Sequence, residues 1–213
     1  VQDLGAHMLV GYSDPQAVRV LVQRGLVGGV FITAHNVRGR SVQQVHAEIA
    51  ELQALRHAAG LAPLIISTDQ EGGAVSRMSP PLARQTTLSR VLAGASDSQI
   101  EALAYDYGAA QGKALASLGV NVNFAPLADL SAPQLRSVLD MRSLIGMRAI
   151  GTDPDRVSAA VIAYARGIES QGVRATLKHF PGLGRVRGDT HLLPANLHAS
   201  AAELETSDWL PFR

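Results

Sequence analysis

Five short, predominantly apolar runs that alternate with helical patterns constrain the fold of this chain more than any other feature. The runs are HMLVGY, VGGVFI, LIIS, VNVNFA and VRATLKHF, at residues 7–12, 27–32, 64–67, 120–125 and 173–180. Runs of this kind are typical of strands in a parallel sheet that helices cover on both faces. The sequence therefore predicts an α/β fold, either a doubly wound sheet or a (β/α)8 barrel.

Helical patterns fill the intervals between these runs. Apolar residues at helical spacing predict helices over residues 14–25, 41–59, 98–118, 153–170 and 199–210. Asp153-Pro154 is a typical helix start, because Asp caps the first turn and proline fits within it. The chain has no internal repeat, low-complexity tract or linker, so we expect residues 1–213 to form a single domain.

Composition excludes several classes of function. The 19 basic and 18 acidic residues give a formal charge of +1 and are scattered, so nucleic acid is not an expected partner. The absence of cysteine excludes disulfides, thiolate nucleophiles and cysteine-based zinc sites. No apolar run reaches the roughly 18 to 20 residues of a membrane span. The location stays open between the cytoplasm and export or lipid anchoring by a targeting segment that precedes Val1.

Polar side chains follow the third and fifth runs, where each predicted strand ends. TDQEGG follows the third run and KHFPG closes the fifth. Parallel α/β folds place their sites at the carboxyl ends of strands, so both segments are candidates. Asp69 is interpreted as a carboxylate that accepts hydrogen bonds from a polar ligand, with a solvated acidic turn as the alternative. Arg77 is interpreted as part of the same pocket, or as the partner of one of these acids. Lys178 and His179 are interpreted as ligand-binding residues, with a hydrogen-bonded core histidine as the alternative for His179.

Asp189-Thr190-His191 is the most specific constellation in the chain. Residues two apart in an extended loop project the same way, so the Asp189 carboxylate can accept a hydrogen bond from one nitrogen of His191. The other ring nitrogen is then free to donate and retrieve a proton near neutral pH. The pattern favours general acid/base chemistry, and an Asx turn beside a surface histidine is the alternative.

Other chemistries lack their motifs. GLGRVRGDT, at residues 182–190, has neither G-x-G-x-x-G nor the G-K-[ST] ending of a phosphate-binding loop. The G-x-S-x-G pattern of serine hydrolases is absent. Asp69, Glu71, His179 and Asp189 are metal ligands by type but lack an H-E-x-x-H kind of spacing. We expect neither a metal nor another cofactor.

Five motifs in this order and spacing carry a family resemblance. They are VGGVFI, ISTDQEGGAVSRM, GVNVNFAPLADL, GMRAIGTDP and KHFPGLGRVRGDTHLLP. The series resembles the N-terminal barrel domain of family 3 glycoside hydrolases, in the β-N-acetylhexosaminidase branch that acts on cell-wall fragments. The resemblance covers nearly the whole chain. It implies the barrel, with about the first five of its eight βα units present, so that the domain is truncated on its C-terminal side.

The resemblance also implies roles for individual residues. Sugar-binding positions of the family fall on Asp69, Arg77, Arg148, Lys178 and His179. Asp189 and His191 match the acid/base dyad of this branch, which replaces the second carboxylate of most glycosidases. Two positions depart from the family motifs: Leu183 stands where the family has a second histidine, and Ala74 where it has an arginine.

The implied activity is that of a retaining exo-β-N-acetylglucosaminidase acting on muropeptides or chitin oligosaccharides. Its aspartate nucleophile is expected after Arg213, because no matching acidic motif occurs within the 213 residues. N-Acetylglucosaminides are the expected partners, and the oligomeric state is left open. The alternatives are a β-N-acetylglucosaminide phosphorylase and a noncatalytic sugar-binding fragment.

Overall fold

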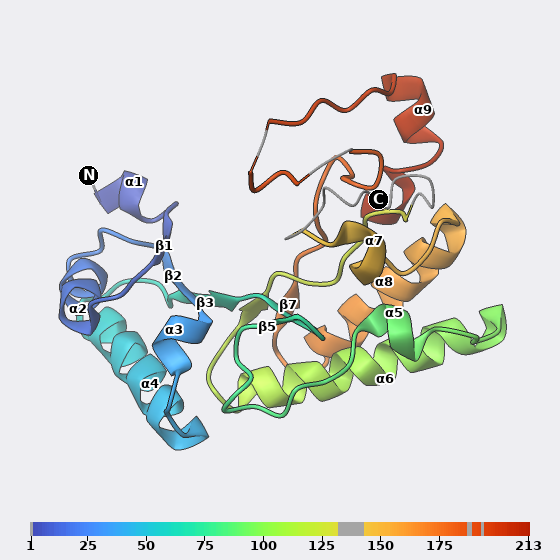
Figure 1. The fold of residues 1–213 in the computed structure, drawn as a ribbon. Coiled ribbons are helices and arrows are strands. Elements are labelled where there is room, and N and C mark those ends of the chain that lie inside the picture. The colour runs from blue at the N-terminus through green and yellow to red at the C-terminus, as the bar shows by residue number, and fades with distance from the viewer. Residues whose placement is uncertain (1, 132–142, 187–188, 193) are drawn as a thin grey trace. The chain divides into compact units, whose positions relative to one another are not determined.

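The computed structural model describes residues 2–131, 143–186, 189–192 and 194–213 (Figure 1). The chain separates into two compact units. Unit 1 comprises Val1–Gln85, Ala110–Phe124 and Ile168–Ala175, and unit 2 comprises Thr86–Ala109, Ala125–Gly167 and Thr176–Arg213. A single domain over residues 1–213 stays a prediction.

Unit 1 is built on a parallel sheet of five strands. In sheet order these are β1 (Leu9–Gly11), β2 (Gly29–Ile32), β3 (Ile65–Thr68), β6 (Val122–Asn123) and β7 (Arg174–Ala175). This order is also their order along the chain, whereas a doubly wound sheet reverses direction at a switch point. The structure confirms the predicted parallel α/β fold, and its strand order is that of a (β/α) barrel.

The core of unit 1 lies on the central strands. Val30, Ile32 and Ile66 are at most 1% exposed, so each removes most of its apolar surface from water. Gly29 is required between its neighbours, because a Cβ on it would lie 2.4 Å from the carbonyl oxygen of Ile65. Close approach of β2 and β3 therefore depends on a residue without a side chain.

The long helices begin where the sequence predicts. They are α2 (Pro15–Gln23), α4 (Val42–Ala58), α6 (Asp97–Ala116) and α8 (Pro154–Glu169). The side chains of Asp14 and Asp153 accept backbone N–H groups in the first turns of α2 and α8. Ser41 and Gln44 form a reciprocal capping box at the start of α4, with distances of 3.2 and 2.8 Å. Within the described residues, no helix combines the length and apolarity that crossing a membrane requires.

Several short elements were not predicted. They are α1 (Gln2–Gly5), α3 (Ala34–Val37), β4 (Gln70–Gly72), β5 (Val75–Ser76), α5 (Leu88–Val91) and α7 (Ile145–Arg148). Each has two to four residues, so none contains enough of a helical or strand period to be recognised.

Two apolar clusters lie in the part of unit 2 that the structure describes. The first contains the buried side chains of Ala128, Leu130, Val157 and Val161. The second contains Leu127, Ile145 and Ala149, against which Leu183 packs. The segment after β6 thus contributes side chains to both clusters, which fixes its position within the unit.

The predicted fifth strand, residues 173–180, is shorter than expected. Only Arg174–Ala175 belongs to the ladder, although Lys178 forms an isolated parallel bridge with Leu127. Pro126 lies in the neighbouring segment and has no N–H to donate, so a continuous ladder is interrupted there.

The predicted helix over residues 199–210 is also wrong in extent. The structure has α9 (Ala201–Glu205) and then a separate 3₁₀ helix, η2 (Leu210–Phe212). The hydroxyls of Thr206 and Ser207 donate to carbonyl oxygens of α9. The buried Asp208 side chain pairs with Arg185. Hydroxyl groups that compete for backbone partners weaken a helix, which accounts for its end at Glu205.

Candidate active site

Asp69 and Arg77 lie at the carboxyl end of β3 in unit 1. Asp69 follows Thr68, the last residue of β3, and the antiparallel hairpin of β4 and β5 returns the chain to it. The Arg77 N–H donates to the Asp69 carbonyl oxygen at 3.1 Å. Gly72 and Gly73 make the turn with φ of 97° and 59°, values that favour glycine. The structure brings the two residues together through their backbones, with Asp69 half-buried and Arg77 exposed.

A buried amide holds this hairpin against the sheet, and it was not predicted. Asn123 in β6 is 0% exposed. Its Oδ1 accepts from the Gln70 N–H and its Nδ2 donates to the Gln70 carbonyl oxygen, both at 2.9 Å. Nδ2 also lies 3.3 Å from Oε1 of Gln111. The sequence signal for this role was an asparagine within an apolar run, because a buried amide needs hydrogen-bond partners.

Lys178 and His179 follow β7 along the chain and belong to unit 2. Lys178 continues the strand direction through its bridge to Leu127, and its side chain is half-buried. His179 turns to Asp129, with its Nδ1 2.7 Å from Oδ2 of that carboxylate. The His179 side chain is 34% exposed and the Asp129 side chain is 0% exposed. His179 is thus hydrogen-bonded, as the core-histidine alternative expects, and still accessible to a ligand.

Asp129 also holds the loop that follows His179. Its Oδ2 accepts from the His179 N–H at 3.2 Å, and its Oδ1 accepts from the Leu183 N–H at 2.7 Å. Leu183, which replaces the family's histidine, packs on an apolar cluster that includes Ile145. Asp129 was missed because its partners lie 50 and 54 residues away along the chain.

Arg148 ends α7 in the same unit. Its Nη1 donates to the Ser143 carbonyl oxygen at 2.5 Å, and the residue is half-buried. Ile145 and Ala149, on either side of it, belong to the apolar cluster on which Leu183 packs. The structure therefore fixes the backbone of Arg148 within unit 2, as it does that of the loop after His179.

Asp189 and His191 form the predicted pair. Oδ1 of Asp189 lies 3.0 Å from Nδ1 of His191 and also accepts the His191 N–H at 2.9 Å. The Asp189 side chain is 1% exposed, whereas that of His191 is 59% exposed. The backbone bond from residue i+2 is an Asx turn, so both interpretations of this motif describe the same geometry. A carboxylate that holds one nitrogen and leaves the rest of the ring open suits proton exchange.

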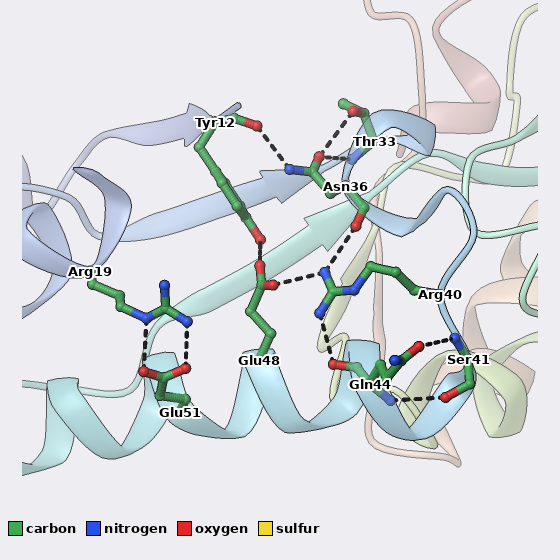
Figure 2. Close-up of polar contacts among 9 residues, drawn as sticks. All are labelled: Tyr12, Arg19, Thr33, Asn36, Arg40, Ser41, Gln44, Glu48 and Glu51. Carbon is green, nitrogen blue, oxygen red and sulfur yellow. Dashed lines mark hydrogen bonds and ion pairs between the residues drawn. The ribbon is translucent and has the colours of Figure 1, made fainter. Parts of the chain in front are cut away.

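A second polar cluster lies at the carboxyl ends of β1 and β2 in unit 1 (Figure 2). Figure 2 shows Tyr12 directed toward Glu48, to which its hydroxyl donates, and burial raises the pKa of Tyr12. Arg40 pairs with Glu48 at 2.7 Å, and Asn36 donates to the Tyr12 carbonyl oxygen at 2.8 Å. These residues help to line a cavity of about 310 Å³, which His35 also borders. Because the four groups bond to one another, we assign them to holding the loops in place.

The residues that are metal ligands by type form no metal site within the part of the chain that the structure describes. Across the described ranges, no group of three His, Asp or Glu side chains is placed to hold a metal ion. Asp69 and Glu71 belong to unit 1, and His179 and Asp189 belong to unit 2. That the protein needs no metal stays a prediction.

A parallel sheet wound in one direction, with polar residues where its strands end, defines the class of (β/α)-barrel proteins. Within that class, the chain belongs to glycosyl hydrolase family 3: residues 2–213 match the N-terminal domain of the family. This membership sets aside the doubly wound sheet and confirms the resemblance seen in the motifs.

Named relatives agree with this placement. A beta-hexosaminidase of Nitrosomonas eutropha is 34% identical over 215 residues, which cover 99% of this chain and 58% of the relative. Beta-hexosaminidase LpqI of Mycobacterium tuberculosis is 34% identical over 191 residues, 86% of this chain and 43% of the relative. The chain therefore spans about half the length of the curated relatives it matches.

Solved structures show the same fold. A family 3 β-N-acetylglucosaminidase from Paenibacillus sp. str. FPU-7 has a TM-score of 0.85 and 30% identity, over 99% of this chain and 38% of that one. NagZ from Neisseria gonorrhoeae, solved in complex with N-trifluoroacetyl-D-glucosamine, has a TM-score of 0.83 and 26% identity, over 96% of this chain and 58% of that one.

Proposed function

We propose that the protein is a retaining exo-β-N-acetylglucosaminidase that removes terminal N-acetylglucosamine from muropeptides or chitin oligosaccharides. The observation that carries the proposal is the contact between the buried Asp189 carboxylate and the open His191 ring, at 3.0 Å. The relatives support the sugar class, since one is named a β-N-acetylglucosaminidase and another binds an N-acylglucosamine.

In this mechanism His191 is the general acid and base. With Nδ1–H held by Asp189, the Nε2 position protonates the glycosidic oxygen as the bond to the sugar breaks. Asp189 keeps the ring in one orientation and stabilises the imidazolium, as the carboxylate of an Asp-His pair does in other hydrolases. The aspartate nucleophile bonds to the anomeric carbon as the glycosidic bond breaks. His191 then takes a proton from the water whose oxygen displaces that aspartate and releases the sugar. We place the aspartate nucleophile in residues that follow Arg213.

Five residues receive a sugar-binding role in this proposal. They are Asp69, Arg77, Arg148, Lys178 and His179. Their chemistry is complementary to a sugar: carboxylate and imidazole nitrogen accept hydrogen bonds from hydroxyls, and the three cations donate to hydroxyl and acetamido oxygens. Half-burial of Asp69, Lys178 and His179 supports the role, because a partly desolvated group binds a polar ligand more strongly than an exposed one.

The proposal is tested by His191→Gln in the intact protein with a chromogenic N-acetylglucosaminide. We expect kcat to fall about 10²- to 10⁴-fold, because general acid/base catalysis is lost, while the Kd for N-acetylglucosamine stays the same. His198→Gln is the matched control, since His198 is an exposed histidine in the same segment. An unchanged kcat in His191→Gln removes His191 from this role.

The phosphorylase alternative is tested in the same assay. The exposed end of the pair is an imidazole, and the carboxylate behind it is only 1% exposed, so less negative charge faces an incoming phosphate than a free carboxylate would present. Added inorganic phosphate should leave the product as free N-acetylglucosamine if the protein is a hydrolase. Formation of N-acetylglucosamine 1-phosphate establishes the phosphorylase instead.

A further inference from the structure

Asp129 is a fully buried carboxylate to which the proposed mechanism gives no role. We propose that Asp129 is a positioning residue for His179: it fixes the proton on Nδ1, so that Nε2 is the nitrogen that accepts a hydrogen bond from the substrate. The inference rests on the proposed sugar-binding role of His179.

The carboxylate of Asp129 is the acceptor in each of its hydrogen bonds to His179 and Leu183. Two backbone N–H groups, of His179 and Leu183, donate to Oδ2 and Oδ1 of Asp129 at 3.2 and 2.7 Å. Both oxygens are thereby placed as acceptors. The His179 ring approaches the same Oδ2 at 2.7 Å, so its Nδ1 is the donor.

The role of Nε2 follows from the chemistry of imidazole. A neutral ring with its proton on Nδ1 has a lone pair on Nε2, and this nitrogen accepts rather than donates. A sugar hydroxyl both donates and accepts. It can therefore donate a hydrogen bond to Nε2 of His179 while its oxygen accepts one from a cation such as Lys178. In the opposite tautomer, Nε2–H and the lysine ammonium are both donors toward the hydroxyl, and the hydroxyl proton has no acceptor.

Asp129 matters more for the orientation of the His179 ring than for the attachment of the loop. Leu183 is also held by its packing on the apolar cluster of α7, so the loop has a second attachment besides Asp129. The ring of His179, in contrast, donates to Asp129, which is its one side-chain partner among the described residues. Removal of the carboxylate should therefore disturb the tautomer more than the path of the loop.

The test is ¹⁵N NMR of the histidine side chains in the intact protein, at a pH where His179 is neutral. In the wild type we expect the proton on Nδ1. Asp129→Ala should shift the population toward Nε2–H, and Asp129→Asn, which keeps an acceptor oxygen, should restore the Nδ1–H form. Asp153→Ala is the control, because the donors to its side chain among the described residues are backbone N–H groups at the start of α8. We expect Asp129→Ala to weaken N-acetylglucosamine binding about tenfold.

The outcomes are distinguishable. A wild-type His179 with its proton on Nε2, or an unchanged Nδ1–H form in a folded Asp129→Ala variant, overturns the inference. If Asp129→Ala does not fold, the wild-type and Asp129→Asn spectra decide in the same way. A protein with the expected tautomers that binds no N-acetylglucosamine supports the positioning of His179 and overturns its sugar-binding role instead.

Discussion

At the scale of single residues, two aspartates hold two histidines that differ in exposure. Asp129 binds the ring of His179 at 2.7 Å and leaves the side chain 34% exposed. Asp189 binds the ring of His191 at 3.0 Å and leaves the side chain 59% exposed. A partly exposed, fixed ring suits recognition of one hydroxyl, and a more open ring suits exchange of protons with a leaving group and water. The separate roles that we propose for these similar pairs follow this difference in exposure.

Gly184 gives a prediction at the same scale. A Cβ on this residue would lie 1.8 Å from the Leu130 carbonyl oxygen, which is backbone and has little freedom to move. Gly184→Ala is therefore expected to lower the free energy of unfolding by about 2 kcal/mol or more, measured by urea denaturation. Gly151→Ala is the control, because no atom lies within 4 Å of its added Cβ. Equal stability of the two variants would contradict the close packing at Gly184.

At the scale of elements, the features that depend on neighbouring residues, such as helix starts and strand positions, were predictable from the sequence. The starts of α2 and α8 were predictable from an Asp-Pro pair, and the runs around β1, β2 and β3 from their apolar residues. The Asp189–His191 contact was predictable because its partners lie only two positions apart in the sequence. The bonds of Asn123 to Gln70 and of Asp129 to His179 span 53 and 50 residues, so no local pattern reveals them.

The attachment of the segment after α9 gives a prediction for elements. Arg185 donates to the buried carboxylate of Asp208 at 2.7 Å, which joins this segment to the loop before Asp189. Asp208→Ala is expected to lower the free energy of unfolding by about 1.5–3 kcal/mol, because a hydrogen bond to a charged group is lost. Glu51→Ala, which removes the exposed pair with Arg19, should have a smaller effect, because water screens that pair. A larger loss in Glu51→Ala would refute the assignment.

At the scale of the whole molecule, we propose that the activity needs an aspartate nucleophile outside the two units. The chain spans 58% of the Nitrosomonas relative, and we place the nucleophile after Arg213. We expect residues 1–213 alone not to hydrolyse a chromogenic N-acetylglucosaminide, and a form extended at the C-terminus to the length of the relatives to hydrolyse it. Hydrolysis by residues 1–213 alone would show that the nucleophile lies within them.

The sequential strand order of the sheet has a consequence for biosynthesis. After β1, each strand of this sheet pairs with the sheet strand synthesised before it. Thr68 of β3, for example, bonds to Ile32 of β2, 36 residues earlier. A ribosome adds about 5–20 residues per second, so β3 leaves the exit tunnel a few seconds after its partner. The sheet can therefore assemble during translation by adding one strand at a time to an edge that already exists.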